Sequence, residues 1–344
     1  MTQESWRSMT ELKTKKRANL RDVAKTAGVS VATVSRVLNA PELVSAETRA
    51  RVQSAIEALH FVPSAAARAI NSGRTRIVGA LVPTLDNAIF ARFLSCLEES
   101  LGTYGLSLVV ATTDGDVAVE AVKADRLVNI GAEALIVSGV SHSAEFDDLV
   151  RRTRLPTIAT SYFDAGYHLP TIGYDNAAAS AMALHHLTSA GHRNIAVFHG
   201  PVEKNDRTRE RLRGLERAGP DVRFHFFAVE ITMEGGAIAT RALLSSGLRC
   251  TALLCFSDIL AMSALAELRR HGRTVPGDLS VTGVDDLPAS AYSEPGLTTV
   301  RLPVSNMGHE TAHAVAGWIE RQAVPGSLLL DCELVIRGST RALS

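Results

Sequence analysis

The chain has 344 residues, of which 46% are hydrophobic and 21% charged, a composition typical of globular proteins with two or three domains. Its net charge of zero hides an asymmetry, because residues 1–76 carry 13 basic and 6 acidic side chains whereas the remainder carries 23 and 30. A basic segment on an acidic body indicates that only this segment meets a polyanion, and no apolar run approaches the ~18 residues of a membrane span.

The first 18 residues are polar and contain the basic run KTKKR, without the apolar stretch of a signal peptide. We therefore expect residues 1–18 to form a disordered extension. The cysteines show no CxxC pair and no histidine cluster at zinc spacing, so we expect free thiols in a reducing cytoplasm, with neither metal nor cofactor. These cysteines are Cys96, Cys250, Cys255 and Cys332.

The stretch Leu20–Asn39 predicts two short helices joined by a tight turn. Asn19 can cap the first helix, and Asp22 can return the hydrogen bond. Gly28 suits the turn because it enters positive φ without a Cβ penalty, and Ser30 can cap the second helix. The outer face of the second helix is small at its start and carries a protruding arginine, so it can enter a DNA major groove. This face consists of Val31, Ala32, Thr33, Ser35 and Arg36.

A third helix is predicted over Ala46–Leu59, with Ser45 as its cap and an apolar stripe that packs on the first two helices. Periodicity alone is equally compatible with an ordinary helical hairpin in a globular core. The string DVAKTAGVSVATVSRVLN, however, closely resembles the DNA-binding motif of the lactose-repressor (LacI/GalR) family of bacterial transcription regulators. The resemblance implies that residues 19–62 form a helix-turn-helix DNA-binding domain.

We expect two roles for the exposed side chains of the second helix. Val31, Ala32 and Arg36 are expected to face base edges, where contacts carry sequence information. The remaining polar side chains are expected to position the helix on phosphates. They are Ser30, Thr33, Ser35 and Asn39.

Residues 63–75 are rich in alanine, and their composition alone indicates a linker. In the family that the chain resembles, this segment is the hinge helix, which orders on DNA and inserts an apolar side chain into the minor groove. Ile70 falls where the family usually places leucine, and Ala67 belongs to the same short helix, so both are candidate DNA contacts. An apolar wedge of this kind kinks the duplex, and a helix of about two turns is marginal away from DNA.

From Arg76 onward, strands and helices alternate at a spacing that predicts parallel sheets covered by helices on both faces. Two such series, joined near residue 160, indicate two similar lobes, with the strand in TIGYDN opening the second series. The last elements are a strand at Leu297–Arg301, a helix at about Ser305–Gln322 and a strand at Leu328–Val335. Their length indicates that the chain crosses between the lobes more than once.

The resemblance extends through this region, where GHRNIA, CFSDILAM and LSVTGVDDLP look like segments of the family's effector-binding core. It implies an α/β fold in which a three-helix head and a hinge helix precede a two-lobed, periplasmic-binding-protein-like core of parallel sheets. Residues 76–344 would then bind the effector and form the dimer.

Polar side chains follow the predicted strands at their carboxyl ends, where open α/β sheets bind ligands. Their carboxylates, guanidinium groups and aromatic rings suit the hydroxyls and the apolar face of a sugar. Each also has an ordinary alternative, because aspartate at a strand end is often a helix cap and RTRERLR is typical of a solvated helix face. The candidates for effector binding are Asp86, Phe90, Ser161, Arg207, Arg211, Phe256, Ser257 and Asp285, with Asn87, Asn205, Asp258 and Asp286 beside them.

Three of these candidates can be compared with the family by motif. Arg211 and Asp285 fall on the family's ligand-contacting arginine and aspartate. Ser161 stands where many relatives have aspartate, so one carboxylate fewer beside additional arginine would suit a sugar acid. The family resemblance therefore leaves both a sugar and a sugar acid open as effectors.

These features together predict a cytoplasmic, homodimeric repressor that binds a pseudo-palindromic operator and is released by its sugar or sugar-acid effector. A corepressor-dependent regulator of the same family is the alternative, and a periplasmic solute-binding protein shares the two-lobed core. An enzyme on a doubly wound fold is disfavoured, because GxGxxG after the first strand, GxxxxGK[ST] and GxSxG are absent, and we expect no catalytic residue.

Overall fold

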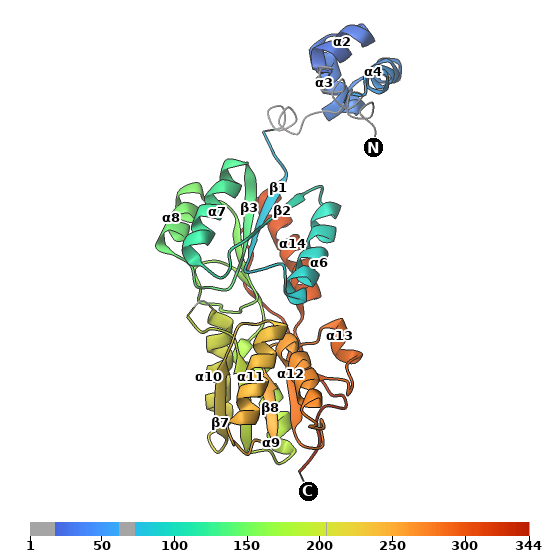
Figure 1. The fold of residues 1–344 in the computed structure, drawn as a ribbon. Helices are drawn as coiled ribbons and strands as arrows, with labels where there is room; N and C mark the ends of the chain where they lie inside the picture. The colour runs from blue at the N-terminus through green and yellow to red at the C-terminus, as the bar shows by residue number, and fades with distance from the viewer. Residues whose placement is uncertain (1–17, 62–72, 204, 344) are drawn as a thin grey trace, which may run out of the picture. The chain divides into compact units, whose positions relative to one another are not determined.

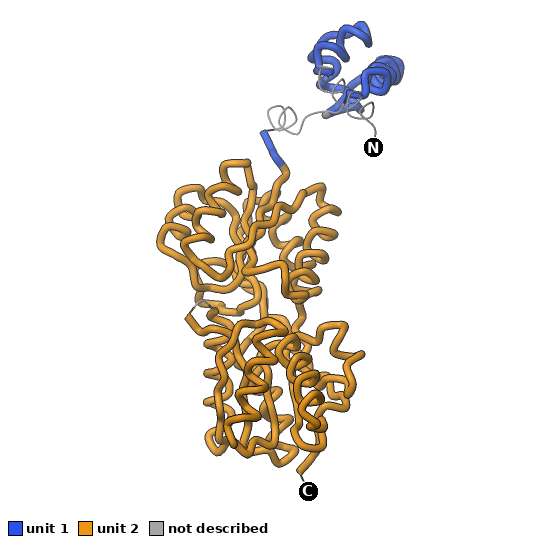
Figure 2. Tube along the Cα trace, viewed as in Figure 1, with its two compact units in different colours: residues 1–75 blue, residues 76–344 orange. Residues whose placement is uncertain are grey.

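The computed structural model describes residues 18–61, 73–203 and 205–343 of the chain (Figure 1). The chain divides into two compact units, residues 1–75 and residues 76–344 (Figure 2). The expected N-terminal extension and the expected hinge helix lie almost wholly outside the described residues. The candidate DNA contacts Ala67 and Ile70 lie outside them too.

The described part of the first unit consists of α2 (Leu20–Ala27), α3 (Val31–Asn39), the 3-10 turn η2 (Pro41–Leu43) and α4 (Ala46–Ala58). The helix caps predicted from the sequence are present. Asn19 accepts from the N–H of Asp22, and the Asp22 carboxylate accepts in return from the Asn19 N–H at 2.9 Å. Ser30 accepts from the N–H of Thr33 at 3.1 Å and so fixes the start of α3. Because these bonds are local, the helix boundaries could be located from the sequence.

The three helices close on a small core, in which one valine from each helix is fully buried: Val23, Val34 and Val52. Arg51 of α4 donates from Nη2 to the carbonyl oxygens of Ala27 and Gly28, at 2.8 and 3.0 Å. Gly28 has a φ of 62°, in the left-handed region that glycine favours. One guanidinium and one glycine therefore hold the turn that orients α3 against α2.

The second unit has two lobes. Lobe 1 consists of β1 (Ile77–Val82), α6 (Ala88–Thr103), β2 (Ser107–Thr112), α7 (Val117–Asn129), β3 (Ala132–Ser138), α8 (Ala144–Thr153), β4 (Thr157–Thr160), β5 (Thr171–Gly173), α14 (Val304–Arg321) and β11 (Leu328–Leu329). Its sheet has the order β11-β5-β4-β3-β1-β2 and is parallel throughout. Helices α6 and α14 pack together on one face of the sheet, and α7 and α8 pack on the other (Figure 1).

Lobe 2 repeats this plan with α9 (Asn176–Ser189), β6 (Asn194–His199), α10 (Asp206–Ala218), β7 (Arg223–Ala228), α11 (Met233–Ser245), β8 (Ala252–Cys255), α12 (Asp258–Arg270), β9 (Ser280–Asp285), α13 (Pro288–Ala291), β10 (Thr298–Arg301) and β12 (Glu333–Val335). Its sheet has the order β12-β10-β9-β8-β6-β7. Helices α9 and α10 pack as a pair, as do α11 and α12. Each sheet is thus buried between two layers of helices, as the alternating sequence predicts.

Three segments connect the lobes, at residues 174–175, 302–303 and 330–332. The strands next to these crossings correct three predictions. The strand in TIGYDN is predicted to open the second lobe, but β5 pairs with β4 in lobe 1 and the crossing follows it. The single strand predicted at Leu328–Val335 is two short strands in different sheets, with a crossover between them. The second sheet is also not wholly parallel, because β12 runs antiparallel to β10 where the chain returns to the edge of lobe 2.

Other sequence-based expectations concern single residues. All four cysteines are free thiols, as predicted. His192 hydrogen-bonds at both ring nitrogens: Nε2 donates to the Arg341 carbonyl at 3.0 Å, and Nδ1 lies 2.9 Å from Thr251 Oγ1, so this histidine anchors the C-terminal segment. Within the described ranges, no helix combines the length and the apolar character that crossing a membrane requires.

Candidate functional site

Helix α3 presents the side chains that the sequence predicts to face DNA bases. Val31 is 42% exposed, and Ala32 and Arg36 are exposed as well. The Arg36 carbonyl accepts from the Ala40 N–H, but the guanidinium has no hydrogen-bond or ion-pair partner among the described residues. A guanidinium on an exposed helix face can donate two hydrogen bonds to the edge of a guanine.

The polar residues of α3 are more engaged than the sequence suggests. The hydroxyls of Ser30 and Thr33 bond to each other at 2.8 Å, because both belong to the helix cap. Ser35 is half-buried. Asn39 is the last residue of α3, and its side chain lies outside the described set. Contact of these residues with phosphates therefore stays a prediction, in which Ser30 and Thr33 would share their hydroxyls with the cap.

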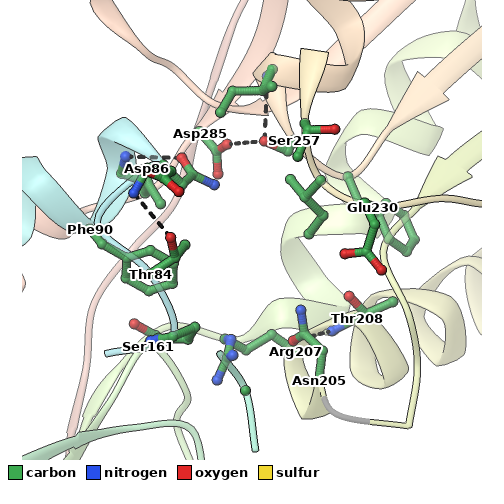
Figure 3. A pocket seen from close by; sticks show the side chains of 18 of the residues that line it. Thr84, Asp86, Phe90, Ser161, Asn205, Arg207, Thr208, Glu230, Ser257 and Asp285 are labelled. Carbon is green, nitrogen blue, oxygen red and sulfur yellow. Dashed lines mark hydrogen bonds between the residues drawn. The ribbon is translucent and has the colours of Figure 1, made fainter. Parts of the chain in front are cut away.

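A cavity of about 830 Å³ lies between the lobes, at the carboxyl ends of their strands (Figure 3). Figure 3 shows Ser257 and Asp285 on one side of the opening and Ser161 and Arg207 on the opposite side. All eight side chains that the sequence proposes as effector contacts line this cavity, as do Asn87 and Asn205. The eight are Asp86, Phe90, Ser161, Arg207, Arg211, Phe256, Ser257 and Asp285. The fold therefore brings together candidates that lie far apart in the sequence, and their contact with an effector stays a prediction.

Asp285 lies at the end of β9 and is 4% exposed. Its Oδ2 accepts from Ser257 Oγ at 2.7 Å and from the Asp258 N–H at 3.3 Å. Burial and the neighbouring Asp258 carboxylate raise the pKa of Asp285, and the Arg211 guanidinium offsets this only in part. The backbone of Asp285 has a φ of 134°, which is strained for a residue with a Cβ. A strained residue with a perturbed pKa in a cavity is typical of a ligand site.

Both arginines of the cavity have acceptors within the protein. Arg211, only 8% exposed, donates from Nε to Asn176 Oδ1 at 3.1 Å and from Nη1 to the Phe256 carbonyl at 2.5 Å. Arg207 donates from Nη1 to Asp206 Oδ1 at 3.0 Å. These bonds occupy part of the donor capacity of each guanidinium before any ligand is considered. No motif in the sequence indicates them.

Other side chains at the cavity were not selected from the sequence. Asp114 follows β2, Glu203 follows β6 and Glu230 follows β7, so the strand-end rule that found the other candidates could have found these carboxylates. Tyr174 and Met307 come from the first crossover and from α14, and no sequence pattern marks them. Among the described residues, no group of three histidine, cysteine or carboxylate side chains could hold a metal ion.

Two aspartates considered beside the candidates are not among the residues that line the cavity. Asp258 is buried and accepts from Ser290 Oγ at 2.6 Å. Asp286 forms ion pairs with Arg301 and Arg337, each at 2.7 Å. Both aspartates therefore bond within lobe 2, and neither caps a helix, which is the ordinary alternative that the sequence offered for a carboxylate at a strand end.

Two family models match the chain. Residues 19–64 match the model described as bacterial regulatory proteins, lacI family. Residues 184–340 match the model described as a periplasmic binding protein-like domain. The first match covers the helix-turn-helix unit, and the second covers most of lobe 2 with the returning helix α14.

The chain is also similar, over nearly its full length, to transcription regulators and to solved structures of such regulators. It is 31% identical over 331 residues to the HTH-type transcriptional repressor CytR of Escherichia coli strain K12, covering 95% of this chain and 97% of CytR. It is 34% identical over 336 residues to the HTH-type transcriptional regulator MalR of Streptomyces coelicolor, covering 93% and 96% of the two chains. The solved Lac repressor dimer bound to operator and the anti-inducer ONPF superposes with a TM-score of 0.86 at 26% identity, covering 95% of this chain and 100% of the other. A complex of the transcriptional regulator CelR with cellobiose superposes with a TM-score of 0.69 at 26% identity, covering 94% and 100%.

Proposed function

The chain belongs to the lacI family of bacterial regulatory proteins and is a ligand-responsive DNA-binding transcription regulator, and we propose that it is a repressor released from its operator by a carbohydrate effector. The observation that carries this proposal is the presence, in one chain, of an exposed recognition helix and an interlobe cavity lined with polar side chains. Its relatives are transcription regulators rather than enzymes. The helix-turn-helix unit argues against a periplasmic solute-binding protein, and a regulator of transcription would act in the cytoplasm.

The proposed DNA contacts divide between two segments. Residues 19–62 would place α3 in a major groove, with base contacts from Val31, Ala32 and Arg36. Residues 63–75 would form the hinge helix, with Ala67 and Ile70 at the minor groove. The exposure of the α3 side chains supports the first assignment. The second assignment rests on sequence alone, because its residues lie outside the described set. The proposed phosphate contacts are Ser30, Thr33, Ser35 and Asn39.

The charges of the cavity favour an uncharged carbohydrate over a sugar acid. Its two arginines already donate to protein acceptors. On the described wall of the cavity, carboxylates outnumber the arginines. These carboxylates would repel the carboxylate of a sugar acid, whereas they would accept hydrogen bonds from sugar hydroxyls. Phe90 and Phe256 offer aromatic surface for the apolar face of a sugar ring. The carboxylates are Asp86, Asp114, Glu203, Glu230 and Asp285.

The proposed switch couples the cavity to the hinge segment. Residues 74–76 lead directly from Gly73 into β1 of lobe 1. An effector shifts DNA affinity only by its differential affinity for the two lobe arrangements, typically ~1–3 kcal/mol, and DNA must change effector affinity by the same factor. Release by the effector is our proposal. Corepression, in which the same movement strengthens DNA binding, is the alternative.

We also propose that the chain acts as a homodimer, because a single recognition helix can bind only half of a pseudo-palindromic operator. The solved Lac repressor that the chain resembles is a dimer on its operator. Analytical ultracentrifugation at micromolar concentration is expected to show a dimer. A monomer both with and without DNA would contradict this assembly.

One experiment tests the central proposal in two steps. A thermal-shift screen with neutral sugars including cellobiose, matched sugar acids and nucleosides is expected to yield a neutral carbohydrate that stabilises the full chain. Genomic DNA fragments selected by the protein are then expected to dissociate when this sugar is added, and to stay bound in the variant Asp285→Ala. Asp278→Ala, which changes an exposed aspartate outside the cavity, is the matched control and should respond as wild type. Failure to select any DNA, or a full sugar response in both Asp285→Ala and Arg211→Ala, would overturn the proposal.

A further inference from the structure

Helix α10 begins with a carboxylate that reaches across to the other lobe. Asp206 belongs to lobe 2 and is 6% exposed. Its Oδ2 accepts from the backbone N–H of Val140 at 2.6 Å and from that of Ser141 at 3.0 Å, in the loop that follows β3 of lobe 1. Its Oδ1 accepts from the N–H of Arg207 at 2.8 Å and from Arg207 Nη1 at 3.0 Å. One carboxylate therefore joins lobe 1, lobe 2 and a cavity-lining arginine.

This carboxylate is not the helix cap of α10. Asn205 has that role, because its side chain accepts from the Thr208 N–H at 3.2 Å. Burial alone would raise the pKa of Asp206, but the Arg207 guanidinium and the N–H groups of Val140, Arg207 and Ser141 hold it below the ordinary value. Asp206 is thus ionised at neutral pH, and hydrogen bonds to an ionised acceptor are stronger than those to a neutral one.

Two further polar contacts from the first turns of α10 also reach lobe 1. Arg209 donates from Nη2 to Ser141 Oγ at 2.8 Å. Tyr162, which follows β4, faces Glu210, and burial together with the Glu210 charge raises the pKa of Tyr162 to about 12. The N-terminal turns of α10 therefore contact lobe 1 at several points, with Asp206 the most buried of them.

The loop that Asp206 contacts is itself fixed within lobe 1. His142 has no exposed side-chain surface, and its Nδ1 lies 2.7 Å from Glu120 Oε2 on α7. Its ring packs on Phe146 of α8, with 4.7 Å between centroids. Because α7 and α8 belong to the body of lobe 1, this loop is fixed to them. A hydrogen bond to the loop therefore restrains the position of lobe 1 and not of the loop alone.

Gly139 makes the close approach of Asp206 possible. Its φ is 87°, and a Cβ at this position would overlap Arg207 Nη1 and lie 2.5 Å from Asp206 Oδ2. Any larger residue would displace the two side chains from the loop. The contact therefore requires both the Asp206 carboxylate on lobe 2 and a glycine, which has no Cβ, at position 139 of lobe 1.

The position of this contact gives it leverage over the cavity. The crossovers follow or precede β5, β10, β11 and β12, which lie at or next to one edge of each sheet. The contact is made by the segments that follow β3 and β6, which are the fourth and fifth strands counted from that edge in their sheets. A bond far from a hinge opposes opening more effectively than a bond beside it.

We infer that Asp206 is a positioning residue for the effector cavity: it binds the backbone of residues 140–141 and so holds the cavity walls of the two lobes, and Arg207 between them, at their observed spacing. The consequence of this contact for regulation rests on the proposed function. A variant whose lobes are held less firmly changes the free energy that an effector has to supply to move the lobes. The contact between the lobes itself does not depend on that function.

Hydrogen exchange of the full chain, without ligand or DNA, tests this inference with Asp206→Ala and Gly139→Ala. Both variants are expected to exchange about tenfold faster than wild type at residues 139–142 and on both cavity walls, at residues 84–93 and 256–262, relative to any change at the buried strands β1 and β8 of the two lobes. Gly272→Ala is the matched control. Gly272 has a φ of 68°, and a Cβ there would have no atom within 4 Å, so this variant adds backbone strain without the collision. It should exchange as wild type on both walls.

Three outcomes would overturn the inference. Faster exchange confined to residues 139–142 would make the contact a local loop restraint, and no change at all would remove its role. If Asp206→Ala unfolds broadly, the comparison of Gly139→Ala with Gly272→Ala decides, and equal exchange of those two variants on the cavity walls would refute the proposed positioning. None of these readouts involves an effector or an operator, so a failure here is distinguishable from a failure of the proposed function.

Discussion

Replacing Arg211 by alanine tests whether the hydrogen bonds of this arginine within the protein contribute to the free energy of unfolding. In the structure, its guanidinium bonds to the Asn176 side chain and to the Phe256 carbonyl, at 3.1 and 2.5 Å. Asn176 in turn donates from Nδ2 to the Ser161 carbonyl at 3.0 Å, so the bonds continue from α10 through the start of α9 to the end of β4. Arg211→Ala leaves two acceptors without their donor in a region that is almost fully buried.

The expected destabilisation follows from the number of groups left unsatisfied. Each buried acceptor that loses its partner costs about 1–3 kcal/mol, which gives roughly 2–6 kcal/mol for the two. Removal of a buried charge returns part of this, because keeping a guanidinium out of water is itself unfavourable. We therefore expect a net loss of about 3 kcal/mol, or roughly 6–12 °C in the Tm of a unit of this size.

Urea unfolding of the full chain, followed by tryptophan fluorescence, measures this loss, since Trp318 of α14 lies in the second unit. Arg213→Ala on the same helix is the matched control. Its side chain is 58% exposed and pairs only with Glu210 among the described residues, so we expect a change within about 0.5 kcal/mol. Wild-type stability of Arg211→Ala would show that these bonds contribute no net energy, and that the guanidinium is available for a ligand.

Three other predictions concern DNA and pH. Arg36→Ala is expected to lose ~1–3 kcal/mol of discrimination between selected and unrelated DNA in fluorescence anisotropy, and an unchanged preference would exclude Arg36 from base readout. Ile70→Ala is expected to weaken specific binding more than non-specific binding, because only a kinked site uses the wedge; equal loss on both DNAs would indicate a general stability defect. Asp285 has a raised pKa in the fold, so its stabilising contribution is complete below the ordinary value of 3.8 and is lost as the pH rises through the folded value. Asp285→Asn should therefore flatten the decline in stability toward neutral pH, and coinciding wild-type and variant profiles would contradict the shift.

Helix positions could be predicted closely because their signals are local. Helix α4 spans Ala46–Ala58 where the sequence predicts Ala46–Leu59, and it begins after the predicted cap, Ser45. Helix α14 spans Val304–Arg321 where the sequence predicts about Ser305–Gln322. Strand-end polarity was similarly informative, because the carboxyl ends of parallel strands meet at one edge and bring distant candidates to one cavity.

The assignment of strands to lobes could not be predicted in the same way. β5 has three residues, and nothing within them indicates whether they pair with β4 of lobe 1 or with a strand of lobe 2. Leu328–Val335 looks like one extended segment, although its two ends pair with strands of different sheets. The partners of Arg207 and Arg211 were hidden for the same reason, since an acceptor such as the Phe256 carbonyl is determined by tertiary packing rather than by a motif.

The return of α14 to lobe 1 has a consequence for synthesis on the ribosome. α14 packs on α6 so closely that a Cβ at Gly308 would lie 3.0 Å from the Leu97 backbone nitrogen. About 200 residues separate the end of α6 from the start of α14, which at 5–20 residues per second amounts to roughly 10–40 s of translation. Throughout that interval the nascent lobe 1 lacks the helix that covers Phe93 and Leu97, although both are buried in the finished protein. The face of α6 is therefore where a nascent-chain chaperone would be expected to bind, after the helix-turn-helix unit has emerged and before lobe 1 can close.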